Sequence, residues 1–412
     1  MASLGPCAFA YPTALFLSAT TVLKWRTPWS LAAEPSSKTE SSNMQYRRLG
    51  NTGVPVSNLT LGTMGFGTET SEDEAFSIID AFLEAGGNML DTADVNGGGA
   101  SEELLGRWRA SRPQNLVNSV VLATKAHIFT GKDVNDVGTF RRHLRRALDA
   151  SLLRLGIEAI DLYQMHAWDP LIPIEETLSF LDAAVRAGKV HYVGLSNFSG
   201  WQLQLALSTA KAMGMQLPVT LQQQYSLACR EIEYEVIPAA LANNVGLLAR
   251  SPLASGFLSG NYTRGGGAEQ GTRLGSESAM FGQIGNSFFA SEQNWATLEV
   301  VTQIADEAGV TPSQVALSWV TNRPSVTSTI FSARTLTQLE SNLPAGDLHL
   351  GEEATARLNA VSAPTPNDDP HGPPAFSSVT AMSTPASRNT ANSLPSEPGG
   401  GVQLLVVKEK GS

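Results

Sequence analysis

Polar side chains that could carry acid and base chemistry stand at the ends of consecutive short apolar segments. Asp91 lies at the end of one such segment, and Lys125 and His166 each follow one directly. A carboxylate beside a buried lysine holds the ammonium in its charged form, and this cation lowers the pKa of a neighbouring hydroxyl acid. Each residue alone has an ordinary structural explanation, such as a cap or a solvated side chain. Their recurrence at successive segment ends predicts one acid/base site.

Amide and guanidinium groups follow the later segments. Asn197 and Gln222 suit a carboxamide ligand, which needs one donor and one acceptor. Arg334, Gln338 and Asn342 are spaced four residues apart, so they share one face where the last predicted barrel helix begins. A helix start with an arginine can bind a phosphate group, although an exposed cation without a ligand is the alternative for Arg334.

The segments themselves indicate how these side chains are positioned. Seven of the eight begin about 30 residues after one another, which is the length of a strand, a loop and a helix, and a longer connection precedes the last. Eight such units predict an α/β fold of the (β/α)8 TIM barrel type, with a long loop between strands 7 and 8. The predicted strands are 59–62, 88–92, 120–124, 160–165, 190–195, 219–222, 245–249 and 326–331.

A doubly wound parallel sheet is the competing architecture. It would place a phosphate-binding glycine fingerprint after the first strand. The glycine run at 97–99 precedes neither a Lys-Ser/Thr pair nor a dinucleotide fingerprint, so the barrel is favoured.

Local signals support the barrel. Ser71 with Glu74, and Thr311 with Gln314, have the spacing of capping boxes at helix starts. The short runs 46–49 and 54–56 flank Asn-Thr-Gly, which predicts a β-hairpin that closes the base of the barrel.

Composition excludes several classes of function. The chain has 412 residues with 38 acidic and 28 basic side chains, a net charge of −10, and so it lacks the positive surface that nucleic acid binding requires. Its two cysteines, Cys7 and Cys229, provide neither a disulfide framework nor a thiolate metal site, and no histidine motif predicts a metal. We therefore expect a protein of a reducing, cytoplasmic compartment.

The two ends differ from the centre. Residues 1–43 contain an apolar stretch at 8–23 that falls short of the roughly 20 residues of a spanning helix, so no stable membrane span is predicted. This region is interpreted as a dispensable extension before Met44, with weak targeting or membrane association as alternatives. Residues 364–412 are rich in Pro, Ser and Thr and predict a disordered tail. The barrel is assigned to 44–363.

Several runs in order resemble the aldo-keto reductase family over 44–360. They include YRRLGNTG, NMLDTAD, SEELLGR, VVLATK, GKVHYVGLSNFS, SPLASGFLSG and ARTLTQLESNL. The resemblance implies an NADP(H)-dependent oxidoreductase, which acts on a small aldehyde, ketone or alcohol and binds its cofactor without a Rossmann motif. It implies that His166 orients the carbonyl and that Lys125 and Asp91 tune the proton donor. The cofactor positions that it implies are Thr63, Asp91, Ser196, Asn197, Gln222, Arg250, Ser251, Pro252, Leu253, Ser255, Gly256, Leu258, Arg334, Gln338 and Asn342.

Four positions depart from the family pattern, among them Asn261 in place of a lysine and Ser332 in place of a glycine. Asn96 stands where the catalytic tyrosine is expected, and Arg250 stands where many members place an aromatic ring beside the nicotinamide. A carboxamide has no acidic proton comparable to that of a phenol, and the loss of a general acid typically lowers a rate by about 10²–10⁴.

Three hypotheses about function follow from these departures. In the first, His166 or water delivers the proton in a working reductase. In the second, the barrel binds NADP(H) without efficient turnover and acts as a redox-sensing or partner-binding subunit. In the third, the substrate carries its own acidic group, or is something other than a simple carbonyl.

Overall fold

The computed structural model describes residues 44–364, apart from 267–271 and 276–278. The predictions for residues 1–43 and for the tail from residue 365 onward lie outside the described residues. Within the described part, no helix is both long and apolar enough to cross a membrane.

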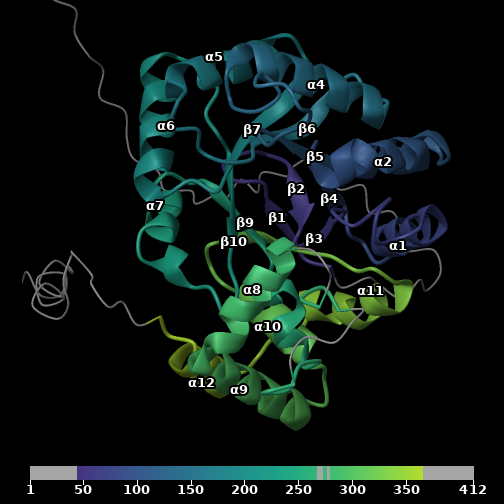
Figure 1. The fold of residues 1–412 in the computed structure, drawn as a ribbon, viewed down its shortest axis with the longest axis vertical. Coiled ribbons are helices and arrows are strands. Elements are labelled where there is room, and N and C mark those ends of the chain that lie inside the picture. Colours follow the sequence, from purple (N-terminus) through teal and green to yellow (C-terminus); the bar gives the residue numbers. More distant parts are fainter. Residues whose placement is uncertain (1–43, 267–271, 276–278, 365–412) are drawn as a thin grey trace, which may run out of the picture. The chain divides into compact units, whose positions relative to one another are not determined.

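Eight parallel strands form a closed barrel, which confirms the predicted (β/α)8 architecture (Figure 1). Consecutive strands are neighbours, and the last strand pairs with the first, with Thr329 opposite Leu59. The strands are β3 (Leu59–Gly62), β4 (Met89–Asp91), β5 (Val121–Ala126), β6 (Ile160–Met165), β7 (Val190–Ser196), β8 (Thr220–Gln224), β9 (Gly246–Arg250) and β10 (Val326–Phe331). Each predicted segment coincides with one of them to within two residues at either end.

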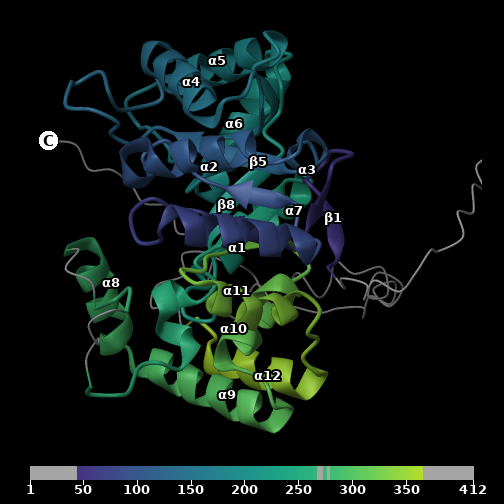
Figure 2. The same cartoon turned by 90° about the vertical axis from the view of Figure 1, so that its right-hand side faces the viewer.

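Helices follow the strands and surround the barrel (Figures 1 and 2). Several of them carry buried residues at helical spacing that belong to one apolar cluster with strand residues, so the apolar faces of these helices pack on the strands. The helices are α1 (Glu72–Glu84), α2 (Ala100–Ala110), α3 (Gln114–Val117), α4 (Arg141–Leu155), α5 (Ile174–Arg186), α6 (Gly200–Ala212), α7 (Val236–Ala242), α8 (Ala279–Ala290), α9 (Glu292–Ala308), α10 (Pro312–Thr321), α11 (Leu336–Asn342) and α12 (Glu352–Val361). Short 3₁₀ turns are η1 (Asn96–Gly99), η2 (Glu231–Glu233), η3 (Ala254–Ser259) and η4 (Leu343–Gly346).

The predicted hairpin is present and closes the amino-terminal end of the barrel. Strands β1 (Tyr46–Arg48) and β2 (Pro55–Ser57) pair antiparallel. Leu49 and Val56 are fully buried in one apolar cluster with barrel residues such as Met89 and Leu248. Gly50 has φ +56, and a Cβ there would lie 1.9 Å from the Val219 carbonyl oxygen, so glycine is needed where the turn meets the strands.

The capping signals differ in outcome. Thr311 and Gln314 form the predicted reciprocal box at the start of α10. Ser71 accepts the Glu74 amide at the start of α1, but the Glu74 carboxylate accepts the Leu336 amide of α11 at 2.6 Å. Glu74 therefore links two helices that are distant in sequence, which local spacing could not indicate.

The long connection between β9 and β10 carries η3, α8, α9 and α10. Phe257 lies at the centre of an aromatic cluster there, with ring centroids 5.1 Å from Trp295 and 5.9 Å from Phe288. This cluster belongs to a second apolar core, beside the barrel. In Figure 2, α8 and the hairpin strand β1 lie on opposite sides of the molecule.

Candidate active site

One large cavity opens at the carboxyl ends of the barrel strands. Its volume is about 1060 Å³, and its lining includes residues at or just after every barrel strand, from Gly62 of β3 to Phe331 of β10. Ligand cavities in proteins typically measure roughly 300–1,000 Å³, so there is room for a ligand as large as a dinucleotide together with a small molecule. All predicted site residues line it except Ser196 and Leu258.

A buried ion pair forms the floor of the cavity on one side. Lys125 Nζ lies 2.5 Å from Asp91 Oδ1 and donates a second hydrogen bond to the Thr92 carbonyl oxygen at 2.7 Å. Asp91 Oδ2 accepts from Gln222 Nε2 at 2.9 Å and from Gln164 Nε2 at 3.2 Å. The carboxylate is thus held by side chains from β5, β6 and β8, which fixes its orientation in the cavity.

Asn96 lines the same side of the cavity, in η1 directly after β4. Its Nδ2 lies 3.5 Å from Thr92 Oγ1, a long contact that leaves the amide available to a ligand. Glycines 97, 98 and 99 follow with φ of +59°, +67° and +105°, so the backbone turns sharply behind it. An amide there can polarise a carbonyl oxygen by donating a hydrogen bond, but it supplies no acidic proton.

His166 lies beside these residues as an uncharged imidazole. Burial lowers its pKa to about 3, and the positive charges of Lys125 and Arg250 act in the same direction. Its Nδ1 is buried, and no described residue forms a hydrogen bond with it. At neutral pH the ring is therefore suited to donate or accept a hydrogen bond, and the interpretation in which a charged His166 protonates an alkoxide is disfavoured.

Arg250, at the end of β9, contacts the loop after β7. Its Nη2 donates to Asn197 Oδ1 at 2.8 Å, and Asn197 Nδ2 donates to the His166 carbonyl oxygen at 2.8 Å. Asn197 and Ser251 have φ of +56° and +54°, and Ser255 has φ +58°. Left-handed backbone in serine costs about 1 kcal/mol or more and is concentrated at ligand sites. These strained loops line the cavity, as expected for a preformed ligand site.

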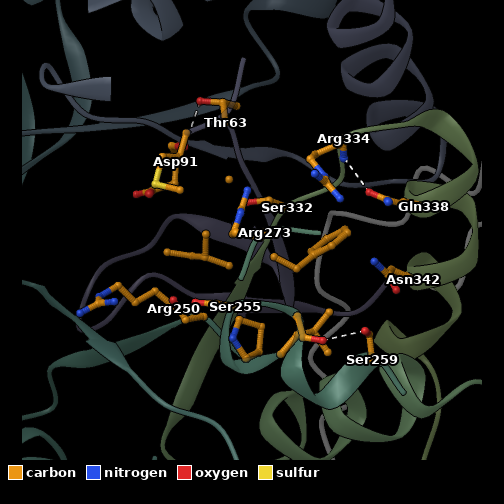
Figure 3. Close-up of a pocket in the computed structure, with 18 of the residues that line it drawn as sticks. Thr63, Asp91, Arg250, Ser255, Ser259, Arg273, Ser332, Arg334, Gln338 and Asn342 are labelled. Atoms are coloured by element: carbon orange, nitrogen blue, oxygen red, sulfur yellow. Dashed lines mark hydrogen bonds between the residues drawn. The ribbon is translucent and has the colours of Figure 1, made fainter. Parts of the chain in front are cut away.

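The opposite side of the cavity carries the predicted phosphate-binding residues. Arg334, Gln338 and Asn342 all line it, and Figure 3 shows Arg334 far from Arg250. The Arg334 amide donates to Gln338 Oε1 at 2.9 Å, and Thr335 caps the start of α11. The three residues thus line the cavity together, but Arg334 precedes the helix, and their role in phosphate binding stays a prediction.

Two predicted cofactor residues lie behind the lining. Ser196 is fully buried, and its Oγ accepts from Asn197 Nδ2 at 3.2 Å. Leu258 is fully buried in the second apolar core, against Phe257 and its neighbours. Ser196 thus supports Asn197, and Leu258 anchors the loop that follows β9.

Several lining residues were not predicted. Met64, Ile128 and Ala167 follow the ends of predicted strands, and the same positional rule could have found them. Arg273 comes from the long connection, where no pattern identifies it, and pairs with Glu69 at 3.3 Å. No group of three or more His, Cys, Asp or Glu side chains that could hold a metal occurs among the described residues.

Asp94 is a buried acid close to the site in sequence but outside the cavity lining. It is 2% exposed, and neither carboxyl oxygen has a hydrogen-bond partner among the described residues. Burial raises its pKa to about 7, and the neighbouring Glu102 carboxylate adds to this effect. The carboxyl group therefore takes up a proton near neutral pH.

Comparison with known proteins identifies relatives along most of the chain. The model of the Aldo/keto reductase family matches residues 58–363. An uncharacterized oxidoreductase of Bacillus subtilis is 37% identical over 326 residues, covering 77% of this chain and 96% of that protein. A probable voltage-gated potassium channel subunit beta of Arabidopsis thaliana is 32% identical, covering 74% and 92%. Versiconal hemiacetal acetate reductase of Aspergillus parasiticus is 32% identical, covering 68% and 87%.

Proposed function

Because the chain belongs to the aldo/keto reductase family, we propose that it reduces small aldehydes or ketones with NADPH, or oxidises the corresponding alcohols, in this cavity. The observation that carries the proposal is that Lys125, Asp91 and the uncharged His166 line one side of a cavity whose other side bears Arg334. Small-molecule carbonyl reduction is the activity that family membership implies.

The residues present fit a nicotinamide cofactor. The cavity has the volume for one, the backbone at Asn197, Ser251 and Ser255 is held in a strained conformation along it, and a buried His166 nitrogen is left without a protein partner. When bound, reduced nicotinamide supplies a hydride to a carbonyl carbon. Asn197 and Gln222 would hold its carboxamide, and Arg334 would contact the 2′-phosphate that distinguishes NADPH from NADH.

The chain's own groups then act on the carbonyl oxygen. His166 and Asn96 polarise this oxygen by donating hydrogen bonds, and the positive charge of Lys125 stabilises the negative charge that develops on it. The proton comes from water, because an uncharged His166 and a carboxamide provide none at neutral pH. We expect slower turnover than a tyrosine at position 96 would give, by a factor on the order of 10²–10⁴.

A second candidate is a subunit that binds NADP(H) without efficient turnover. It is favoured by Asn96 at the proton donor's position and by the similarity to probable potassium channel subunits beta. In that function the bound cofactor would report redox state to a partner protein.

One set of measurements on the full chain separates the two candidates. NADPH affinity is measured by fluorescence titration, and NADPH oxidation is followed on a panel of aldehydes for the parent, Asn96→Tyr and the size-matched control Asn96→Leu. The reductase proposal expects measurable parental turnover, a rise in Asn96→Tyr and a fall in Asn96→Leu. Binding with turnover in Asn96→Tyr alone would favour the second candidate, and absence of NADPH binding would overturn both.

The phosphate role has its own test. Arg334→Ala should weaken NADPH binding by about 10- to 100-fold and NADH binding far less, because a charge-assisted hydrogen bond to a phosphate contributes roughly 1.5–3 kcal/mol. Equal losses for the two cofactors would remove this assignment.

A further inference from the structure

The 3₁₀ turn η1, which carries Asn96, is flanked by three charged side chains outside the cavity lining. Asp94 precedes the turn, Glu102 belongs to α2 and Arg154 belongs to α4, and these two helices pack side by side (Figures 1 and 2). Glu102 has no exposed surface, and Asp94 is 2% exposed. We call these three side chains the acid cluster, because two carboxyl groups and one cation share a space that is largely closed to water.

The two acids of the cluster differ in their hydrogen bonds. Arg154 Nη2 lies 2.6 Å from Glu102 Oε2, and Arg154 Nε donates to the same oxygen at 2.8 Å. Thr124 Oγ1 donates to the other Glu102 oxygen at 2.6 Å. The oxygens of Asp94 have no hydrogen-bond partner among the described residues, and neither has the hydroxyl group of Tyr163, a fully buried neighbour from β6. Glu102 is thus satisfied as a carboxylate, whereas Asp94 is not.

The charge on Asp94 changes within the physiological pH range. Burial favours its uncharged form, and the Glu102 carboxylate acts in the same direction. Arg154, the Val95 amide and Lys125 favour the charged form but are outweighed, so the pKa of Asp94 is raised to about 7. The carboxyl group therefore holds a proton below pH 7 and is ionised above it.

A packing contact connects the acid cluster to the turn. A Cβ on Gly99 would lie 3.0 Å from Arg154 Cδ and 3.1 Å from its Nε, so the Gly99 backbone rests directly on this side chain. Glycines 97 and 98 also have positive φ, and glycine changes its backbone conformation at little cost. The side-chain contact of Asn96 is long, at 3.5 Å, and does little to hold the residue in place. A displacement of Arg154 is therefore passed on to Asn96.

We propose that Asp94 is a positioning residue that makes the carbonyl-binding site sensitive to pH near neutrality. Uncharged Asp94 leaves Arg154 on Glu102 and Asn96 against the carbonyl oxygen of the substrate. Ionised Asp94 draws Arg154 towards itself, and the turn moves Asn96 away from that oxygen. This inference rests on the proposed function, because it assigns Asn96 a hydrogen bond to the carbonyl.

The guanidinium of Arg154 has the capacity for this exchange. Within the described part of the chain, its Nη1 forms no hydrogen bond. A buried carboxylate without a donor is costly, and a charge-assisted hydrogen bond from a guanidinium offsets that cost. Ionisation of Asp94 is therefore the event that redistributes one cation between two acids.

The first test is the pH dependence of aldehyde reduction by the full chain with NADPH. From pH 6 to pH 8.5, kcat/KM of the parent should fall about 3- to 10-fold more than that of Asp94→Asn, which cannot ionise, because one hydrogen bond to the carbonyl oxygen is lost. The proton demand of the reaction is common to all variants, and His166 titrates near pH 3, outside this range. Asp73→Asn, at an exposed position of α1, is the control and should keep the parental profile. A parental profile in Asp94→Asn would overturn the inference.

A double variant tests whether Asp94 acts through Asn96. Asn96→Leu removes the hydrogen bond to the carbonyl, so its pH profile and that of Asp94→Asn with Asn96→Leu should coincide. A pH-dependent loss of parental size in Asn96→Leu, removed by the added Asp94→Asn, would overturn the route through Asn96. Asp94→Glu retains an ionisable group and should restore a pH-dependent loss that Asp94→Asn lacks.

Hydrogen exchange makes the inference independent of turnover. Backbone amides of residues 93–100 are followed by mass spectrometry, with the intrinsic pH dependence of exchange subtracted. In the parent, the corrected exchange should accelerate about 3-fold or more from pH 6 to pH 8.5, and Asp94→Asn should lack this acceleration. Equal exchange in the two proteins would overturn the inference. An Asp94-dependent acceleration in a protein that reduces no aldehyde would overturn the proposed function and support the coupling between Asp94 and η1.

Discussion

Replacing Asp94 by asparagine should stabilise the protein, and more so at higher pH. The carboxyl group is 2% exposed, lacks hydrogen-bond partners among the described residues and has its pKa raised from 3.8 to about 7 by burial and by Glu102. Between these two values the folded state binds the proton and the unfolded state has released it. Stability from this group is therefore highest at low pH and is lost as pH rises towards 7 and beyond.

The magnitude follows from the two pKa values, at 1.36 kcal/mol per unit. At pH 8 the ionised Asp94 lowers the free energy of unfolding by about 4 kcal/mol, and at pH 5, where the folded state keeps its proton, by about 2 kcal/mol. Asparagine has nearly the same shape and no charge. Any cost of its own unpartnered amide is the same at both pH values, so the change between them isolates the charge.

The assay is denaturant-induced unfolding at pH 5 and pH 8. The stability advantage of Asp94→Asn over the parent should grow by roughly 2–3 kcal/mol from the lower pH to the higher. Asp73→Asn, at an exposed position of α1, is the matched control and should stay within about 0.5 kcal/mol of the parent. An Asp94→Asn advantage of the same size at both pH values would refute the reasoning, because it would mean that the charge is not the source of the cost.

Three further predictions concern His166, the packing of α2 and a helix cap. The folded-state pKa of His166 is about 3, below the unfolded value of 6.5. As the pH falls from 7.5 to 5, the parent should therefore lose roughly 2 kcal/mol of its free energy of unfolding through this group. Denaturant unfolding of His166→Gln at the same two pH values should lack that loss. Gly106→Ala would place a Cβ 2.1 Å from the Arg154 carbonyl oxygen and should cost about 1–3 kcal/mol, whereas Gly53→Ala, with nothing within 4 Å, should change the melting temperature little. Thr311→Ala should lower the free energy of unfolding by about 1 kcal/mol through loss of its cap, and a Thr311→Ser variant that is equally destabilised would contradict the capping explanation.

The barrel could be predicted because its signals are periodic and local. Each strand is a short apolar run at a regular interval, and the rule that parallel strands meet at one end then places Asp91, Lys125 and His166 together. The hairpin and the Thr311 cap were predictable for the same reason, since the residues that decide them are neighbours in sequence.

What escaped prediction depends on contacts between distant residues. The Glu74 carboxylate bonds to the Leu336 amide, 262 residues away, in place of its own helix start. Ser196 has a site residue's sequence position, yet its side chain is buried beneath Asn197. The uncharged state of His166 arises from burial and from charged neighbours on other strands, which spacing along the chain does not report.

The closure of the barrel between its first and last strands has a consequence for synthesis of the chain. The hydroxyl groups of Thr60 and Ser328 share a hydrogen bond across 268 residues of sequence. During translation β3 therefore emerges early, and its backbone N–H and C=O groups on the β10 side stay unpaired until β10 has been synthesised. Folding of the barrel can be completed only after nearly all of it has left the ribosome, and the nascent chain is exposed to edge-to-edge association until then.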